Sequence, residues 1–217
     1  AAALALGLDR NLTYYDLEQD RRVKSNQLDA KLDYYYILNK KSNLNFVAGT
    51  ILSTQNFNSR FYQLLDNGAV LDPSPDIIPD PVPNPNPNRD YNKTTNDTEY
   101  NFTDIYAGVR YRLKNGIFTF TPGFTLHSYN SNNTQYGTEF FKDKFEKFLP
   151  EFEVVAQFKT SESLTFTYKE EVNFTDVNQI ARGIVANSYN SFFAGSSDLV
   201  NASFHNLSLF YRSFNLF

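Results

Sequence analysis

The sequence lacks cysteine and methionine entirely over its 217 residues. Without cysteine, neither a disulfide scaffold nor a cysteine-based metal site is available. No apolar run approaches the roughly 20 residues that a membrane-spanning helix needs, which excludes a helical membrane protein. The formal net charge of −4 and the pI near 5.2 argue against a nucleic-acid partner, because nucleic-acid binders usually present a basic patch.

The first ten residues, AAALALGLDR, lack the features of a secretory signal peptide. They contain no initiator methionine and no basic region, and their apolar run is short and soon followed by Asp9 and Arg10. Methionine is also absent from the rest of the chain. We therefore expect a processed protein or a piece of a longer one.

A strict alternation of apolar and polar residues marks the stretch IFTFTPGFTLHSY at 117–129. In a β-strand, alternate side chains point to opposite faces, so one face of this stretch is aromatic and the other is rich in threonine. The alternation recurs at 28–38, 105–113, 148–158 and 164–174, and more weakly at 44–56. Several of these segments exceed the usual length of a globular strand, about 5–6 residues.

The two faces of these segments suggest two different environments. The face predicted to contact lipid contains Phe118, Phe120, Phe124, Phe152, Val154, Phe158, Phe166 and Tyr168. The face predicted to line a wet lumen contains Thr119, Thr121, Thr125, His127, Arg110, Arg112, Glu151 and Glu153.

The predicted connections between segments alternate in length. Short turns are predicted at 39–43, 114–116 and 160–163. A further turn near 16–22 is predicted to join the first two segments on the same side as the long loops. Long loops are predicted at 57–98, 130–145 and 177–198, the first of them holding the proline-rich stretch 72–88. Short periplasmic turns and long extracellular loops are typical of outer-membrane barrels, so the long loops are predicted to be extracellular. Tyrosines near the predicted strand ends fit an interfacial aromatic girdle, although they also fit the rim of a soluble sheet.

Two stretches carry a family resemblance. GIFTFTPGFTLHSY and the C-terminal stretch from FLPEFEVVAQF to FYRSFNLF resemble the later barrel strands of TonB-dependent outer-membrane receptors of Bacteroidetes type, the subfamily with a carboxypeptidase-like regulatory domain. The resemblance extends from about residue 96 to the end, and more loosely over 23–66. It implies an all-β fold, an antiparallel transmembrane β-barrel, in which residues 1–217 supply about eight consecutive strands of about 22.

The resemblance also implies a function and a set of partners. The function is import of an unidentified ligand across the outer membrane of a Gram-negative bacterium. The partners are outer-membrane lipid and lipopolysaccharide, the TonB system acting through a plug absent from this chain, and a surface lipoprotein. Two other interpretations stay open, namely a complete eight-stranded barrel with an adhesin or structural role, and a soluble β-sandwich that binds a ligand.

Catalysis finds little support in the sequence. Only two histidines are present, and Ser128 next to His127 points to the opposite face of a strand, so no nucleophile–histidine pair is evident. We expect no enzyme activity, no cofactor and no metal. Candidate ligand contacts are the aromatic and amide side chains of one predicted loop, Tyr189, Asn190, Phe192 and Phe193, since such mixtures bind ligands by stacking and hydrogen bonding.

Overall fold

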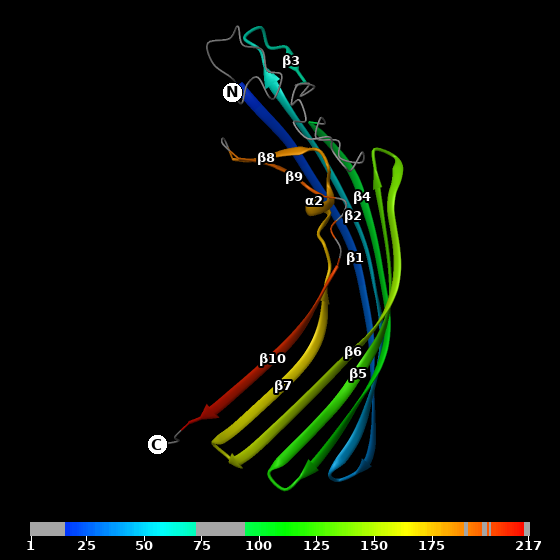
Figure 1. Ribbon diagram of the computed structural model, residues 1–217, viewed down its shortest axis with the longest axis vertical. Coiled ribbons are helices and arrows are strands. Elements are labelled where there is room, and N and C mark those ends of the chain that lie inside the picture. Colours follow the sequence, from blue (N-terminus) through cyan, green and yellow to red (C-terminus); the bar gives the residue numbers. More distant parts are fainter. Residues whose placement is uncertain (1–15, 73–93, 189–190, 197–198, 200, 215–217) are drawn as a thin grey trace, which may run out of the picture.

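The computed structural model describes residues 16–72, 94–188, 191–196, 199 and 201–214. Most of these residues lie in antiparallel strands that form one curled sheet, shaped like half of a barrel wall (Figure 1). The predicted all-β antiparallel fold is confirmed.

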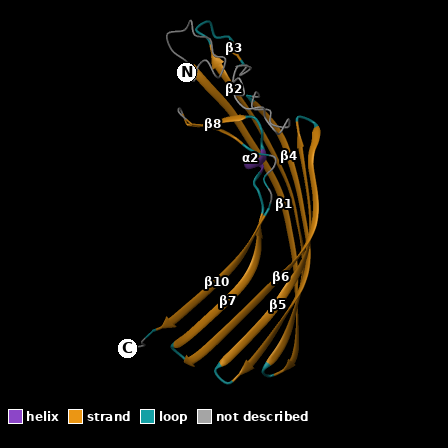
Figure 2. Ribbon diagram, viewed as in Figure 1, coloured by secondary structure: helices purple, strands orange, loops and turns teal. Residues whose placement is uncertain are grey.

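The eight-stranded sheet has the order β1-β2-β4-β5-β6-β7-β10, with β3 pairing only with β2. Its strands are β1 (Asp16–Asn39), β2 (Ser42–Leu64), β3 (Val70–Leu71), β4 (Thr95–Asn115), β5 (Phe118–Gln135), β6 (Thr138–Lys159), β7 (Glu162–Asn173) and β10 (Ala202–Ser213). The short helix α2 (Val177–Ile180) and the hairpin of β8 (Ile184–Ser188) and β9 (Ser191–Ala194) lie on the concave side of the sheet (Figure 2). Among the described residues, no helix has the length and apolarity needed to cross a membrane.

The strand register sorts side chains onto a convex outer face and a concave inner face. Leu126 on β5 lies opposite Ala107 on β4 and Phe148 on β6, so these apolar residues share the outer face. His127, one residue further along, lies opposite Tyr106 and Lys147 on the inner face. The alternation of the sequence is therefore in phase across these three strands.

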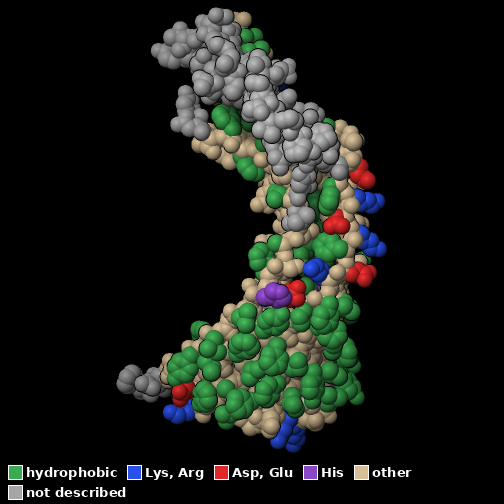
Figure 3. Space-filling model, viewed as in Figure 1, with side chains coloured by type: hydrophobic (Ala, Val, Ile, Leu, Met, Phe, Trp, Pro, Cys, Tyr) green, Lys and Arg blue, Asp and Glu red, His purple; other side chains and the backbone are tan. Residues whose placement is uncertain are grey.

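An apolar band crosses the outer face in the lower half of the sheet (Figure 3). Phe120 lies opposite Val154, which in turn lies opposite Phe166, and Phe166 lies opposite Leu209. On the central strands the band extends from Phe118 to Leu126 and from Phe148 to Phe158. Many of its side chains are exposed, including Leu32, Ile105, Leu126, Phe148, Leu207 and Leu209. The eight residues predicted to contact lipid lie in this band.

The three predicted short turns are present, and they gather at the lower end of the sheet (Figure 1). They join β1 to β2, β4 to β5 and β6 to β7, each through two residues. Gly116 in the second turn has a φ of 60°, a left-handed conformation that glycine adopts at little cost and that tight hairpins favour.

The long loop predicted at 130–145 is corrected by the structure. Strand β5 continues to Gln135 and β6 begins at Thr138, so only Tyr136 and Gly137 form the turn. Their φ angles of 51° and 75° match a tight type I′ hairpin. The sequence NSNNTQYG resembles a loop because it is polar, but beyond the apolar band a strand no longer needs an apolar face.

Two other predicted connections are shorter than expected. The turn predicted near 16–22 belongs to β1, where Arg22 lies opposite Asn58. The loop predicted at 57–98 loses its ends to β2 and β4, which are strands up to Leu64 and from Thr95 onwards. The proline-rich residues 73–88 lie outside the described part of the chain. In both cases the strand pairing extends above the apolar band through charged and polar residues.

Candidate functional site: the inner face

The connection after β7 folds inward onto the sheet. We call residues 176–188 and 191–196 the inner segment; it contains α2, β8 and β9. A capping box starts α2, in which the Asp176 carboxylate accepts a hydrogen bond from the Asn178 backbone and Gln179 Oε1 accepts one from the Asp176 N–H at 3.0 Å. The loop predicted at 177–198 is thus largely ordered structure rather than an open excursion.

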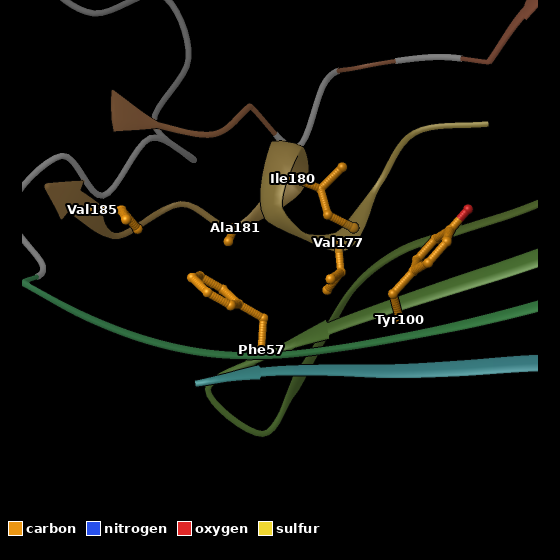
Figure 4. Close-up of a cluster of buried hydrophobic side chains, with 6 residues drawn as sticks. All are labelled: Phe57, Tyr100, Val177, Ile180, Ala181 and Val185. Carbon is orange, nitrogen blue, oxygen red and sulfur yellow. The ribbon is translucent and has the colours of Figure 1, made fainter. Parts of the chain in front are cut away.

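A small hydrophobic core joins the inner segment to the inner face (Figure 4). Phe57 on β2 is fully buried, and Tyr100 on β4 is nearly so. Both pack in one cluster with residues of the inner segment, namely Val177, Ile180, Ala181 and Val185. Burying a side chain such as phenylalanine contributes about 1.5–3 kcal/mol, so this cluster holds the segment against the sheet.

Side-chain amides from three strands also hold the inner segment by its backbone. Gln19 Oε1 on β1 accepts a hydrogen bond from the Ala186 N–H at 2.7 Å, and Gln19 Nε2 donates one to the Ala186 carbonyl at 3.2 Å. Asn96 on β4 accepts the Gly183 N–H at 2.7 Å. Gln135 on β5 donates to the Ile180 carbonyl at 2.9 Å. The long strands above the apolar band therefore provide anchors for the segment.

Gly183 occupies a position where the inner segment touches the backbone of β4. A Cβ atom at this residue would lie 2.2 Å from the carbonyl oxygen of Thr95. We expect Gly183→Ala to destabilise the docked segment by about 1–3 kcal/mol, because the strand backbone cannot yield without breaking its ladder. Hydrogen exchange at residues 181–186 measures the effect.

The matched control for this substitution is Ser188→Ala, on an exposed position of β8 in the same segment. It leaves the contact with Thr95 intact, and exchange at 181–186 should stay within twofold of the wild-type rate. Equal exchange in both variants would contradict the close packing at Gly183.

The structure divides the predicted ligand-contact residues. Phe192 and Phe193 lie on β9 and are 39% and 40% exposed. The Phe192 ring meets Phe61 edge-on, with a centroid distance of 5.9 Å. Tyr189 and Asn190 lie outside the described residues. Contact of Phe192 and Phe193 with a ligand stays a prediction.

Below the inner segment, the inner face holds a cluster of charged and aromatic residues. We call Asp104, Tyr106, Arg110, His127, Tyr129 and Glu151 the lumen cluster. They line a hollow of about 330 Å³, together with Lys31, Lys169 and Glu171. The predicted lumen residues Arg110, Thr125, His127 and Glu151 are brought together here.

His127 is held on both sides by hydrogen bonds. Its Nδ1 lies 2.9 Å from both carboxylate oxygens of Asp104, and its Nε2 lies 3.0 Å from Thr125 Oγ1. Its ring stacks between Tyr106 and Tyr129, with centroid distances of 5.0 and 5.2 Å. The imidazole is therefore fixed in both position and plane.

The series of Asp104, His127 and Thr125 has the connectivity of a hydrolase triad. A triad also needs N–H donors aimed at the oxyanion. Thr125 lies on a central strand, opposite Gly108 on one side and Leu149 on the other, so the backbone around it is engaged in the sheet ladder. The geometry thus favours a structural role for this polar group.

Arg110 and Glu151 form an ion pair across β5, with both guanidinium Nε and a terminal nitrogen directed at the carboxylate. Gly123 lies between them in the ladder, opposite both residues. A Cβ atom on Gly123 would lie 2.7 Å from Arg110 Cγ, so the glycine makes room for the arginine stem. The remaining predicted lumen residues lie lower on the inner face: Thr119, Thr121, Arg112 and Glu153.

Sequence reasoning overlooked Asp104, Tyr106 and Tyr129 as members of this cluster. The predicted hairpin turn at 114–116 was the signal that could have found them, because a two-residue turn between β4 and β5 sets the register that puts Asp104 opposite Tyr129 and Tyr106 opposite His127. Among the described residues, no group of three or more histidine and carboxylate side chains is arranged to hold a metal ion.

Above the apolar band, neighbouring groups and burial shift the pKa of several side chains, among them Asp72 and Tyr100. The Arg60 guanidinium, 2.8 Å from both Asp72 oxygens, lowers the pKa of that carboxyl. Burial raises the pKa of the Tyr100 phenol beneath the inner segment. The ion pair joins Asp72, in the connection after β3, to Arg60 on β2. The raised pKa of Tyr100 follows from its burial under the inner segment.

Comparison with known proteins gives a similarity of fold. No known protein-family profile matches the sequence, and no curated protein matches it. Among solved structures, the fold resembles the ferric citrate transporter FecA in its unliganded form, with 14% identity and a TM-score of 0.48. The match covers 72% of this chain and 21% of FecA, so the chain spans about a fifth of that protein's length. This similarity concerns the fold alone.

Proposed function

We propose that this chain is part of the wall of an outer-membrane β-barrel transporter of the TonB-dependent class, importing a ligand across the outer membrane. The single observation that carries the proposal is the apolar band on the outer face, opposite an inner face of charged and polar side chains. A soluble sheet would expose this band to water, which is unfavourable over so large an area.

The dimensions of the band support a membrane-spanning role. Transmembrane β-strands need about 9–11 residues. On the outer face, the apolar positions run from 118 to 126 on β5 and from 148 to 158 on β6. Both stretches fall within that requirement, and charged side chains gather beyond the band (Figure 3).

The inner face supports the transport part of the proposal. In it, the lumen cluster presents both charge signs to the interior, which suits contact with water or with a polar plug supplied from outside this chain. The inner segment narrows the interior above the cluster and presents Phe192 and Phe193 to an incoming ligand. Energy then enters through the plug and the TonB system, and the chain itself performs no catalysis and carries no cofactor.

Detergent dependence tests the membrane assignment. The complete protein that contains this chain should fractionate with outer membranes and require detergent to stay monodisperse. A monodisperse protein without detergent would favour the soluble sandwich and overturn the proposal. A complete protein only as long as an eight-stranded barrel would favour the adhesin or structural alternative.

Sidedness gives a second test. We expect an epitope tag inserted after Asn84 to be reached by antibody in intact cells, and a tag after Asn115 to be silent until the outer membrane is permeabilised. The reason is that long insertions are tolerated at a surface that meets ligands, whereas the three two-residue turns at the opposite end need no exposure. Labelling at Asn115 alone would invert the topology.

A further inference from the structure

The hairpin of β8 and β9 is a small sheet of its own, with two edges. Its two strands pair only with each other. In Figure 1 the hairpin extends away from the large sheet across the concave side, instead of joining it. Each edge of a two-stranded sheet has backbone N–H and C=O groups that point away from the partner strand. The register of the pair and the contacts around it show which groups these are.

The edge of β8 is bonded by a side-chain amide. Gln19 on β1 accepts a hydrogen bond from the Ala186 N–H at 2.7 Å and donates one to the Ala186 carbonyl at 3.2 Å. A carboxamide that bonds the N–H and the C=O of one residue reproduces the contact that a neighbouring antiparallel strand makes. This hairpin therefore already holds a peptide-like group at one of its edges.

The same contact shows which groups of β9 point outward. Ala186 lies opposite Phe192, and both Ala186 backbone groups are directed at Gln19 instead of at β9. In an antiparallel pair, opposite residues either exchange both hydrogen bonds or exchange neither. Phe192 therefore directs its N–H and C=O away from β8. Ala194 does the same, because the pattern repeats every second residue.

The outward edge of β9 is open. Within the described part of the chain, no hydrogen bond reaches the backbone N–H or C=O of Phe192 or Ala194. Residues 191–193 are exposed. Gly195 turns its N–H back to the Ala181 carbonyl at 2.8 Å, as the alternation requires. The edge thus presents two donors and two acceptors, repeating every two residues or about 6.8 Å.

Aromatic side chains lie beside this edge on both faces of the hairpin. Phe192 and Phe193 are neighbours on one strand, so their rings point to opposite faces. The Phe192 ring also meets Phe61 of the large sheet edge-on, with a centroid distance of 5.9 Å. A strand added beside β9 places its alternate side chains next to these rings, and cross-strand pairs of aromatic and aliphatic side chains are favourable.

We propose that the open edge of β9 binds an extended peptide, which adds antiparallel to β9 as a third strand, with an apolar side chain against Phe192. This inference rests on the proposed function and names its ligand class. An extended peptide backbone repeats its N–H and C=O groups at the spacing of this edge, and exposed sheet edges bind peptides in this way. The hairpin lies far from the three two-residue turns, toward the end of the sheet that the proposed sidedness places outside (Figure 1). A peptide arriving from outside therefore meets it.

Binding of a synthetic peptide to the complete protein in detergent tests the site. The probe is an acetylated and amidated pentapeptide in which threonine and leucine alternate, with leucine second and fourth. A leucine opposite Phe192 lies in a hydrogen-bonded pair, so its N–H faces β9. N-methylation of both leucines should weaken binding at least tenfold, because it removes these donors and adds bulk at the edge. N-methylation of the third and fifth residues, both threonines, should change binding by less than about twofold, because their N–H groups face away.

Two substitutions at Ala194 test the same edge from the side of the protein. Ala194→Pro removes one outward N–H, which the hairpin itself does not use, and proline is tolerated at such an edge position. Peptide binding should fall about tenfold. Ala194→Val keeps the N–H and is the matched control, with binding equal to that of the wild type. Hydrogen exchange at residues 181–186 should be the same in both variants, since the inner segment stays docked.

Hydrogen exchange of the wild type locates the peptide. The peptide should slow exchange of the Phe192 and Ala194 amides and leave the Phe193 amide, which already faces β8, unchanged. Protection of the Phe192 and Ala194 amides without peptide would mean that another part of the complete protein occupies the edge, and would overturn the inference.

The remaining outcomes separate this site from the proposed function. Equal binding of the two N-methylated peptides would refute strand addition at β9. A protein that needs detergent but does not bind the pentapeptide would refute the peptide site and leave the transporter proposal intact. A protein that is monodisperse without detergent and binds the pentapeptide at β9 would overturn the transporter proposal and keep the edge as a peptide site.

Discussion

Replacing Phe120 by arginine is expected to destabilise the folded barrel by roughly 2–4 kcal/mol, the cost of a charged side chain facing lipid near the middle of the bilayer. Phe120 lies in the apolar band, opposite Val154 and two residues from Pro122 near the band's centre on β5. Phe166→Arg should have a similar effect, because Phe166 lies in the same row, opposite Val154 from the other side. Reversible unfolding of the complete protein in lipid vesicles, followed by denaturant titration, measures both.

The neighbouring residue provides the control. Thr121 is on the inner face, opposite Glu153, so arginine there meets water and a carboxylate instead of lipid. Thr121→Arg should change the free energy of unfolding by less than about 1 kcal/mol. If Phe120→Arg and Phe166→Arg both cost less than about 0.5 kcal/mol, the assignment of the outer face to lipid fails.

Truncating Phe57 to alanine is expected to release the inner segment from the sheet. The phenyl ring is fully buried in the cluster that α2 and β8 form against β2 and β4. Removing a buried phenylalanine ring costs about 3–5 kcal/mol, because apolar contacts are lost and a cavity remains. Amide hydrogen exchange at residues 177–186 should therefore become faster by about 100-fold or more.

Phe46 is the matched control for this substitution, because it lies on the same strand but on the outer face. It is 44% exposed and lies opposite Tyr34 and Val109 in the apolar band. Phe46→Ala should leave exchange at 177–186 unchanged. Unchanged exchange in Phe57→Ala as well would mean that the segment is held by its side-chain hydrogen bonds alone.

Much of the sheet could be predicted from the alternation of residue types. In the lower half, one face is apolar and the other polar, so a period of two is visible in the sequence and fixes both strands and faces. The positions of the short turns were equally visible, although the second turn is formed by Gly116 and Ile117 and not by the Asn115-Gly116 pair that the sequence suggests.

The upper half of the sheet could not be predicted in the same way. Above the band, the strands carry polar residues on both faces, as in the stretch around Asn130 and Asn132, and a polar stretch without alternation is typical of a loop. The long strand β1 was obscured for the same reason in the charged sequence around Arg21 and Arg22. These polar stretches are strands because they pair with neighbouring strands of similar length, and the local sequence does not indicate that pairing.

The inner segment was the least predictable part of the candidate site. Its anchors, Gln19, Asn96 and Gln135, are more than 40 residues away in sequence from the groups they bind. Only the folded sheet brings them together. A single sequence contains no signal that connects such distant residues. Only the aromatic character of Phe192 and Phe193 was visible in advance.

The direction of the two edge strands has a consequence for the complete assembly. Each strand of the path from β1 to β10 is antiparallel to the next, and the path contains β1, β2, β4, β5, β6, β7 and β10. With an odd number of such strands, β1 and β10 point the same way. If they met directly, the seam would be parallel, and β1, with 24 residues, would extend past β10, with 12. A closed, fully antiparallel barrel therefore requires an odd number of additional strands between β1 and β10.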